Sequence, residues 1–194
     1  MEKLIQLDER LFLYLNHLGN ARWDGFWLFV TAERAWIPLY GLLALLLVWK
    51  LGWMRGGLAL LSVLLLFGFT DQFTGLVKHF FHRPRPCYDA ELSGLVRLVT
   101  SHCGGRYGFT SGHAGNAFGL AGFVVLVFRR ISRWIYAMWL WAAVVAYSRV
   151  YLGVHFPLDI LCGGLFGVVS ACLFYRLYVI ALDYMVFGRP AGLS

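Results

Sequence analysis

The apolar run GLALLSVLLLFGFTDQFTGLV at residues 57–77 is the clearest indication of how this chain folds. Its length matches the roughly 20 residues with which an α-helix crosses a bilayer, and Asp71 is its only charged residue. Similar apolar runs predict further spans at about 36–48, 113–128, 131–148 and 157–178, with 23–31 as a shorter candidate. The sequence therefore predicts an all-α fold, a polytopic membrane helical bundle of about five to six transmembrane helices.

The whole chain has the composition of a membrane protein. Hydrophobic residues make up 60% of it and charged residues 14%, whereas soluble domains carry about 25% charged residues. No internal repeat or long linker divides it. We therefore expect one integral membrane domain over residues 1–194, with an interfacial segment at 1–33, a transmembrane bundle at 34–188 and an outer loop at 78–112.

The N-terminal residues predict an amphipathic helix rather than a span. Leu4, Leu7, Leu11 and Leu18 recur at helical spacing, and the charged residues between them are too frequent for a span. Such a helix lies on the membrane surface. A helix packed against a loop of the same protein would show the same pattern, so both arrangements stay open.

The distribution of basic residues predicts the orientation. Cytoplasmic loops of membrane proteins carry an excess of Lys and Arg, and three basic groups fall on one side of the predicted spans: Lys50 and Arg55; Arg129, Arg130 and Arg133; Arg176 and Arg189. We expect that side and the C-terminus to be cytoplasmic. The N-terminus, the loop at 78–112 and the turn near His155 then share the outer face.

The outer face is itself basic, against the usual rule. It carries Lys78, Arg83, Arg85, Arg97, Arg106 and Arg149, together with five histidines. An ordinary solvated basic loop would explain Arg97 and Arg106. It does not explain Lys78, Arg149 and His155, which lie at span ends, whereas an anionic ligand does.

The cysteines fit this layout. Cys87 and Cys103 both lie in the outer loop, where an oxidising compartment favours a disulfide between them. Cys162 and Cys172 lie inside the last span, where cysteine usually acts as a small packing residue.

Two polar clusters flank the outer loop. The first runs from Lys78 to Arg85-Pro86 and combines a point charge with a guanidinium fork, which together suit a phosphoryl group. The second, Ser111-Gly112-His113, opens a span, and the free N–H groups of a helix start attract anions. Alone, the first would be an interfacial anchor and the second an ordinary helix cap.

The third cluster carries the most specific chemistry. His155 and Asp159 are four residues apart and so share a helix face, with Arg149 just before them. Asp159 can accept a hydrogen bond from one imidazole nitrogen, which leaves the other with a free lone pair for attack on phosphorus. Asp71 lies two turns before Lys78. We expect it to pair with Lys78 or Arg149, or to hydrogen-bond within the bundle.

Together the clusters resemble the signature of the type 2 phosphatidic acid phosphatase superfamily of membrane lipid phosphatases. Its first motif is Lys, six residues, Arg-Pro, and is matched by Lys78 and Arg85-Pro86. Its second is Pro-Ser-Gly-His, and is matched by Ser111, Gly112 and His113, with Thr110 in place of the proline. We expect that exchange to alter rigidity rather than chemistry.

The third motif is Ser-Arg, five residues, His, three residues, Asp, and is matched by Ser148-Arg149, His155 and Asp159. Order and spacing agree over about residues 78 to 159, and the surrounding spans suit the family's helical bundle. The N-terminal third carries no family motif. A five-span chain would be one short of the usual six.

The resemblance implies a role for each matched residue. His155 would attack the terminal phosphorus and form a phosphohistidine, Asp159 would orient His155, and His113 would protonate the leaving oxygen and then activate water. The phosphate-binding residues would be Lys78, Arg85, Ser111, Gly112 and Arg149. The family needs no metal and no cofactor, and the sequence shows no separate carboxylate cluster for one.

The resemblance also implies the substrate class and location. A membrane lipid phosphate or diphosphate is the expected partner, with no nucleic acid, in the inner (plasma) membrane of a bacterium. Undecaprenyl diphosphate ranks first because the compact chain resembles small bacterial members. The other substrates that remain are phosphatidylglycerophosphate, phosphatidic acid and lipid A. A lipid phosphotransferase, and a lipid-binding module that would tolerate His155→Ala, are the alternative functions, and the oligomeric state is open.

Overall fold

The computed structural model describes residues 2–188, and over that range the chain is built from α-helices with no β-strand. The helices are α1 (Glu2–His17), α2 (Ala21–Thr31), α3 (Ile37–Leu51), α4 (Trp53–Phe81), α5 (Gly112–Phe128), α6 (Ala137–Tyr151) and α7 (Pro157–Phe187). Short 3₁₀ helices lie at Glu33–Trp36, Pro86–Tyr88 and Arg133–Tyr136. The predicted all-α class is confirmed. Arg189 and the C-terminal end of the chain lie outside the described residues.

The predicted spans correspond to helices α3 to α7, with changed boundaries. Three helical segments are long and apolar enough to cross a membrane, namely Glu33–Leu51, Trp53–Phe81 and Pro157–Val186, and α5 is apolar but shorter. The span expected from residue 131 begins its α-helix only at Ala137, because the chain turns at 129–131 and then forms the 3₁₀ helix Arg133–Tyr136. The last helix continues past Tyr178 to Phe187. The total number of spans stays a prediction.

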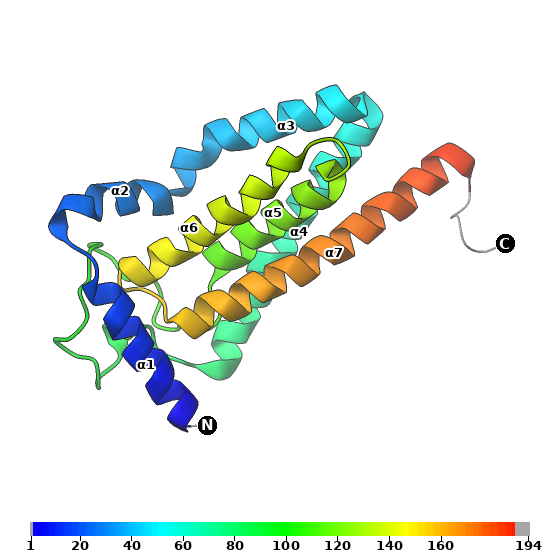
Figure 1. The fold of residues 1–194 in the computed structure, drawn as a ribbon. Coiled ribbons are helices and arrows are strands. Elements are labelled where there is room, and N and C mark those ends of the chain that lie inside the picture. The colour runs from blue at the N-terminus through cyan, green and yellow to red at the C-terminus, as the bar shows by residue number, and fades with distance from the viewer. Residues whose placement is uncertain (1, 189–194) are drawn as a thin grey trace.

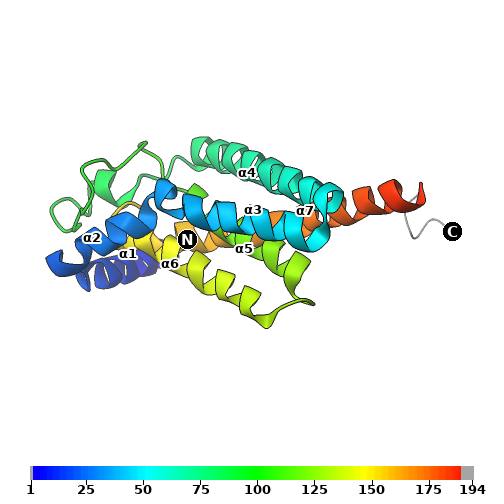
Figure 2. The same ribbon diagram turned by 90° about the horizontal axis from the view of Figure 1, so that it is seen from above.

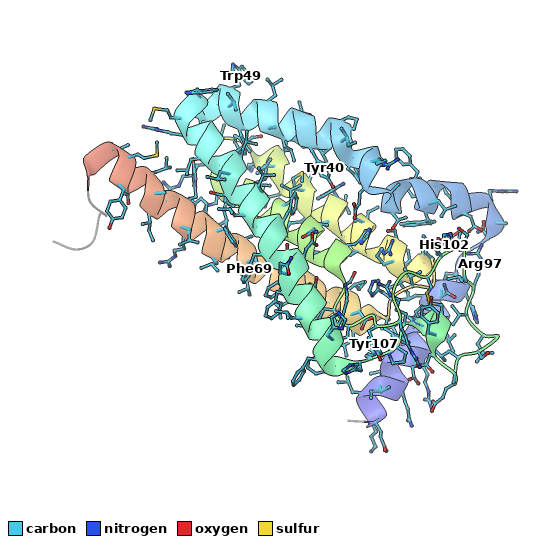
Figure 3. The ribbon with its side chains drawn as sticks, turned by 180° about the vertical axis from the view of Figure 1, so that it is seen from behind. Tyr40, Trp49, Phe69, Arg97, His102 and Tyr107 are labelled. Atoms are coloured by element: carbon cyan, nitrogen blue, oxygen red, sulfur yellow. A yellow bond between two sulfur atoms is a disulfide. The ribbon has the colours of Figure 1, made fainter. Side chains whose placement is uncertain are left out.

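Helices α3 to α7 run side by side, while α1 crosses one end of them (Figure 1). The long loop between α4 and α5 and the turn between α6 and α7 lie at this same end, and α7 projects beyond its neighbours at the other (Figures 1 and 2). Arg97, His102 and Tyr107 are gathered at the loop end, and Trp49 lies at the opposite one (Figure 3). The three segments predicted to share a face therefore lie together.

Helix α1 packs against the protein through one face and exposes the other. Asp8, Phe12 and Asn16 are its buried residues, whereas Leu4, Leu7, Leu11 and Leu18 are all more than 40% exposed. The packed arrangement that the sequence left open is thus present. Contact of the exposed leucines with the membrane surface stays a prediction.

Helices α5 and α7 meet along a seam of glycines. A Cβ atom at Gly163 would overlap the carbonyl oxygen of Ser111, and one at Gly167 would overlap that of Gly115. The two backbones are therefore in direct contact, as small residues permit between helices in membranes. This contact holds the start of α5 against the start of α7.

The outer loop is closed on itself at Cys87 and Cys103. Their sulfurs are bonded and their Cα atoms are 6.5 Å apart, within the usual range for a disulfide. The arrangement agrees with the predicted pairing, which stays a prediction until thiols are counted.

Candidate active site

Helix ends converge on one polar centre at the loop end of the bundle. Ser111 precedes α5 and accepts a hydrogen bond through Oγ from the N–H of Ala114 at 3.5 Å, which starts this helix. Pro157 stands in the first turn of α7, where the lack of an N–H costs nothing. His155 lies in the turn between α6 and α7. Its N–H donates to the carbonyl oxygen of Arg149 at 3.3 Å, which keeps that turn tight.

His155 is held between a carboxylate and a guanidinium. Its Nδ1 lies 3.3 Å from Oδ2 of Asp159, and its Nε2 lies 3.2 Å from Nη1 of Arg85. A guanidinium can only donate and a carboxylate can only accept. Both contacts are therefore satisfied by a neutral imidazole with its proton on Nδ1, which leaves the lone pair on Nε2.

The surroundings of His155 favour this neutral form. The side chain is 2% exposed. Burial lowers the pKa of His155 well below its usual 6.5, and the charges of Arg85, Arg149 and Lys78 lower it further. The imidazole is thus a base and a nucleophile rather than a cation at neutral pH.

Asp159 is wholly buried and uses both carboxylate oxygens. Oδ2 accepts from the N–H of Phe156 at 3.0 Å as well as facing His155, and Oδ1 accepts from Arg83 at 3.1 Å. The backbone N–H of Ser111 donates to the Asp159 carbonyl at 3.0 Å, which ties the second cluster to the third. A Cβ atom at Gly108 would lie 3.2 Å from Oδ2 of Asp159, so the loop approaches closely where it has no side chain.

The remaining cations surround this centre from other helices. Nζ of Lys78 would lie 3.9 Å from a Cβ atom at Gly112, so α4 brings it to the start of α5. Arg149 donates through Nη1 to Oγ1 of Thr31, which anchors its guanidinium from α2. Within residues 2–188, Nε of Arg85 and Nε of Arg149 are buried without a hydrogen-bond acceptor.

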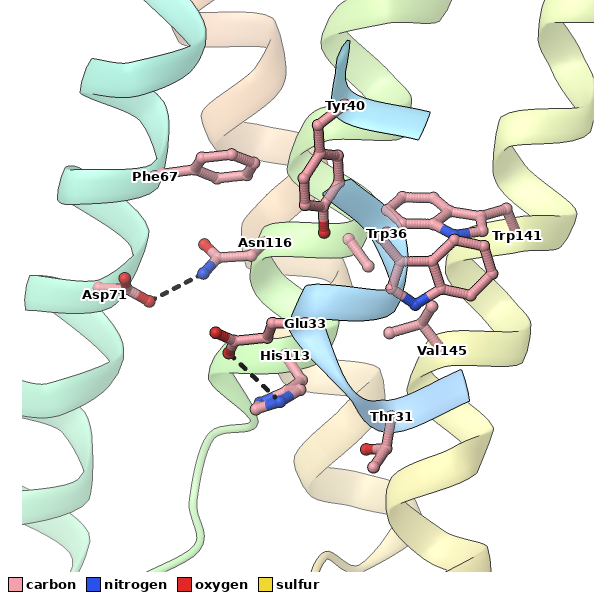
Figure 4. A pocket seen from close by; sticks show the side chains of 11 residues that line it. Thr31, Glu33, Trp36, Tyr40, Phe67, Asp71, His113, Asn116, Trp141 and Val145 are labelled. Atoms are coloured by element: carbon pink, nitrogen blue, oxygen red, sulfur yellow. Dashed lines mark hydrogen bonds and ion pairs between the residues drawn. The ribbon is translucent and has the colours of Figure 1, made fainter. Parts of the chain in front are cut away.

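His113 lies at the edge of the centre and lines a cavity of about 240 Å³. Its Nε2 is 3.4 Å from Oε1 of Glu33, and the charges of Arg149, Lys78 and Arg85 act on it. Figure 4 shows His113 and Glu33 meeting at one side of the cavity, with Trp36 and Trp141 on another wall. The structure thus brings together the eight residues that the motifs predict for catalysis and phosphate binding.

The role left open for Asp71 is resolved. Its Oδ1 accepts a hydrogen bond from Nδ2 of Asn116 at 2.9 Å, so it bonds within the bundle to α5. Neither Lys78 nor Arg149 hydrogen-bonds to it in the described structure. Among residues 2–188, no three His, Cys, Asp or Glu side chains are grouped as a metal site, and metal independence stays a prediction.

The sequence did not single out Asp8, and it predicted Arg83 only as one of the basic residues of the outer face. Arg83 donates to Oδ1 of Asp159 and, at 2.6 Å, to Oδ2 of Asp8 on α1. Its guanidinium thus bridges two carboxylates and also lies over the ring of Phe156. In the sequence Asp8 looks like one more charge on the polar side of an amphipathic helix, so no local signal separated it from the exposed charges beside it.

Comparison with known proteins gives consistent results. A family model described as PAP2 superfamily matches residues 56–182. The chain is 33% identical to the Lipid A 4'-phosphatase of Bacteroides thetaiotaomicron over 90% of its own length and 78% of the relative's. It is 29% identical to the Undecaprenyl-diphosphatase of Sulfolobus acidocaldarius, over 86% of its own length and 76% of the relative's.

One solved structure extends the comparison to three dimensions. The crystal structure of Aquifex aeolicus LpxE superposes with a TM-score of 0.65 and 26% identity, covering 86% of this chain and 93% of that one. The ranking of undecaprenyl diphosphate as first substrate is not supported by these comparisons. The relative with the higher identity and coverage of the two carries a lipid A name.

Proposed function

This chain belongs to the PAP2 superfamily and is a membrane lipid phosphatase, and we propose that it removes a phosphate from a lipid headgroup through a phosphohistidine at His155. The observation that carries the proposal is the placement of His155 between Asp159 and Arg85, with Nε2 unprotonated and accepting a hydrogen bond from Arg85. An oriented, neutral imidazole is the nucleophile that this chemistry requires.

In the first step Nε2 of His155 bonds to phosphorus as the bond from phosphorus to the lipid oxygen breaks. His113 donates its proton to that leaving oxygen. In the second step His113 takes a proton from water, the water oxygen bonds to phosphorus, and the bond from phosphorus to Nε2 breaks. Asp159 accepts a hydrogen bond from the Nδ1–H of His155 throughout and stabilises the positive imidazole ring.

Cationic and backbone donors bind the phosphoryl oxygens in this proposal. Lys78, Arg85 and Arg149 supply charge, and the N–H groups at the Ser111–Gly112 helix start supply oriented donors. The two buried Nε–H groups without acceptors support this assignment, because a buried unpaired donor costs free energy that an anionic oxygen would recover. Positioning and charge stabilisation of this kind are most of what phosphoryl transfer asks of a protein.

We further propose that the natural substrate carries its phosphate on a sugar headgroup, as lipid A does. The cavity beside His113 combines the flat faces of Trp36, Tyr40 and Trp141 with the polar groups of Glu33 and Asn116 (Figure 4). Aromatic faces pack on the apolar faces of sugar rings, while carboxylates and amides bind hydroxyl groups. Within the described residues, the buried Nε1–H of Trp141 has no acceptor, and a sugar oxygen would supply one.

The test is phosphate release by purified, detergent-solubilised protein with EDTA present. Lipid A, undecaprenyl diphosphate, phosphatidylglycerophosphate and phosphatidic acid would be offered in parallel. We expect full activity in EDTA and the largest kcat/KM for lipid A, with Trp141→Phe lowering that value several-fold more for lipid A than for phosphatidic acid. Equal kcat/KM on all four lipids would overturn the sugar preference. No release from folded protein would favour the phosphotransferase, which an added lipid acceptor would then reveal.

We also propose that the site faces the outside of a bacterial inner membrane and that the α3–α4 and α5–α6 turns face the cytoplasm. The basic residues of those turns support this orientation. Single cysteines would be placed at the exposed Arg106 and at the exposed Arg130, in a background with Cys162 and Cys172 replaced by serine. In intact cells a membrane-impermeant thiol reagent should label the first and spare the second, and the opposite pattern would reverse the orientation.

A further inference from the structure

The buried face of α1 carries polar residues that need partners. Asp8, Phe12 and Asn16 are four residues apart and lie on one face, with 6%, 0% and 0% of each residue exposed. Polar groups buried to this degree are normally hydrogen-bonded, and losing the bonds costs free energy. Both polar residues find their partners at the turn that carries His155.

Asp8 holds the chain just after that turn. Its Oδ1 accepts from the backbone N–H of Leu158 at 2.8 Å, in the first turn of α7. Its Oδ2 accepts from Nη2 of Arg83 at 2.6 Å, and Nη1 of Arg83 donates to Oδ1 of Asp159 at 3.1 Å. A continuous series of contacts thus runs from Asp8 through Arg83 and Asp159 to Nδ1 of His155.

Asn16 holds the chain just before the turn. Its Nδ2 donates to the carbonyl oxygens of Val150 at 3.2 Å and of Tyr151 at 3.0 Å, at the end of α6. Between the two polar residues, the ring of Phe12 packs edge-on against Phe156 with centroids 5.3 Å apart. Helix α1 therefore contacts the chain on both sides of His155, at residues 150 and 151 before it and at residues 156 and 158 after it.

The charges along this series have a consequence for the reaction. Arg83 stands between two carboxylates, so the group of Asp8, Arg83 and Asp159 carries one net negative charge beside His155. When Nε2 bonds to phosphorus, the imidazole ring becomes positive and needs that charge. Without the charge of Asp8, the guanidinium of Arg83 would offset the charge of Asp159 alone, and Asp159 would stabilise the positive ring less.

We propose that Asp8 is a positioning residue for His155, acting through Arg83 and Asp159, so that the N-terminal helix is part of the catalytic apparatus. This inference rests on the proposed role of His155 as nucleophile. It gives the part of the chain without a family motif a defined task in the reaction. Asp8 would stabilise the positive ring, which forms only in the transition state, so its replacement should lower kcat rather than raise KM.

The decisive variant is Asp8→Asn in the full-length, detergent-solubilised protein. The amide oxygen still accepts from Leu158, but the charge is gone. We expect kcat for phosphate release to fall roughly 10- to 100-fold with KM within about twofold, the size of effect seen when the outer partners of a metal-bound histidine are removed. Asp8→Glu, which keeps the charge, should recover most of kcat.

Asp24→Asn is the matched control. It removes a pair of equal length, Asp24 to Arg97 at 2.6 Å, which holds α2 to the outer loop and is not part of the series from Asp8 to His155. Its kcat should stay within about twofold of wild type. Equal losses of kcat in the two variants would overturn the inference, and so would a rise in KM at unchanged kcat for Asp8→Asn.

A second variant decides the matter if Asp8→Asn fails to fold. Arg83→Lys keeps one positive charge but cannot bridge two carboxylates with a planar fork. It should lower kcat by about tenfold or more at unchanged KM, and wild-type kcat would overturn the inference. His155→Gln separates this result from the proposed function, because turnover by that variant contradicts the nucleophile itself, whatever Asp8 does.

Discussion

Two aspartate–arginine pairs tie the N-terminal helices to the rest of the molecule, and they differ in what lies beyond them. Both are 2.6 Å long. The side chains of Asp8 and Arg83 are 6% and 17% exposed, and Arg83 also pairs with Asp159, which contacts His155. Asp24 and Arg97 are each 26% exposed, and their side chains contact Tyr151 rather than a residue of the proposed catalytic centre. The length of an ion pair therefore says little about its role. What matters is which further residue the pair contacts.

The largest expected effect comes from replacing His155, the residue to which the contacts of the Asp8–Arg83 pair lead. His155→Gln should lower phosphate release by about 10³-fold or more while the protein stays folded, as loss of a nucleophile does in other covalent mechanisms. In this background Asp8→Asn should cause no further loss, because it acts only through His155. The measurement is phosphate release from lipid A together with a thermal unfolding curve. Residual turnover above about 1% would remove His155 as the nucleophile.

The next largest expected effect is a loss of stability when the packing of Phe12 beside the Asp8–Arg83 pair is removed. Phe12→Ala should lower the free energy of unfolding by roughly 3–5 kcal/mol, because the ring is wholly buried against Phe156 and its loss leaves a cavity. Tyr14→Ala on the same helix is the control, since this ring is 65% exposed. The midpoint of thermal unfolding in detergent measures both. Similar midpoints for the two variants would mean that α1 is not docked as described.

The second pair can be loosened without touching the first. Arg97 lies inside the segment that Cys87 and Cys103 close, whereas Arg83 lies before it. Cys87→Ser with Cys103→Ser should cost about 3 kcal/mol of stability, as expected for a loop of this length. At a temperature where the variant is folded, kcat should change by less than about twofold. The unfolded, unreduced wild-type protein should show two free thiols, Cys162 and Cys172, and four would exclude the disulfide.

The smallest expected effect is a dependence of the free energy of unfolding on pH, caused by the buried His155. The pKa of His155 lies well below 6.5 in the folded protein, so below about pH 6.5 the unfolded chain binds a proton that the folded protein does not. Stability should therefore fall as pH falls, by at most about 1.4 kcal/mol per pH unit from this residue. The unfolding midpoint of His155→Gln should be less sensitive to pH between 6.5 and 5 than that of wild type. Parallel curves would mean that His155 is not buried as a neutral base.

The fold class and the site were predictable because both have local signatures. Apolar runs at 36–48 and 57–77 indicate helices. His155 and Asp159 do meet, but not on one helix face as their separation of four residues predicted, because α7 begins only at Pro157 and Asp159 reaches back over the helix start to His155. The start of α6 was placed too early. Residues 129–131 form a turn and Arg133–Tyr136 a 3₁₀ helix, instead of the first turns of the α-helix.

The contacts of α1 could not be predicted because they join distant parts of the chain. Asp8 pairs with a residue 75 positions away, and Asn16 with carbonyl oxygens more than 130 positions away. In the sequence both residues look like the polar side of an amphipathic helix. Which polar residue turns inward depends on where the loop and the α6–α7 turn come to lie, and no local pattern records that. The contact of Glu33 with His113 is hidden for the same reason.

The glycine seam between α5 and α7 sets where this scaffold can be re-engineered. Gly163 and Gly167 lie against backbone atoms of the facing helix, so a library of substitutions there should return mostly unfolded protein. The walls formed by Trp36, Tyr40 and Trp141 line open space instead. Selection for a new lipid headgroup should therefore accumulate its changes on the 3₁₀ helix Glu33–Trp36, α3 and α6, while the glycine seam is left as it is.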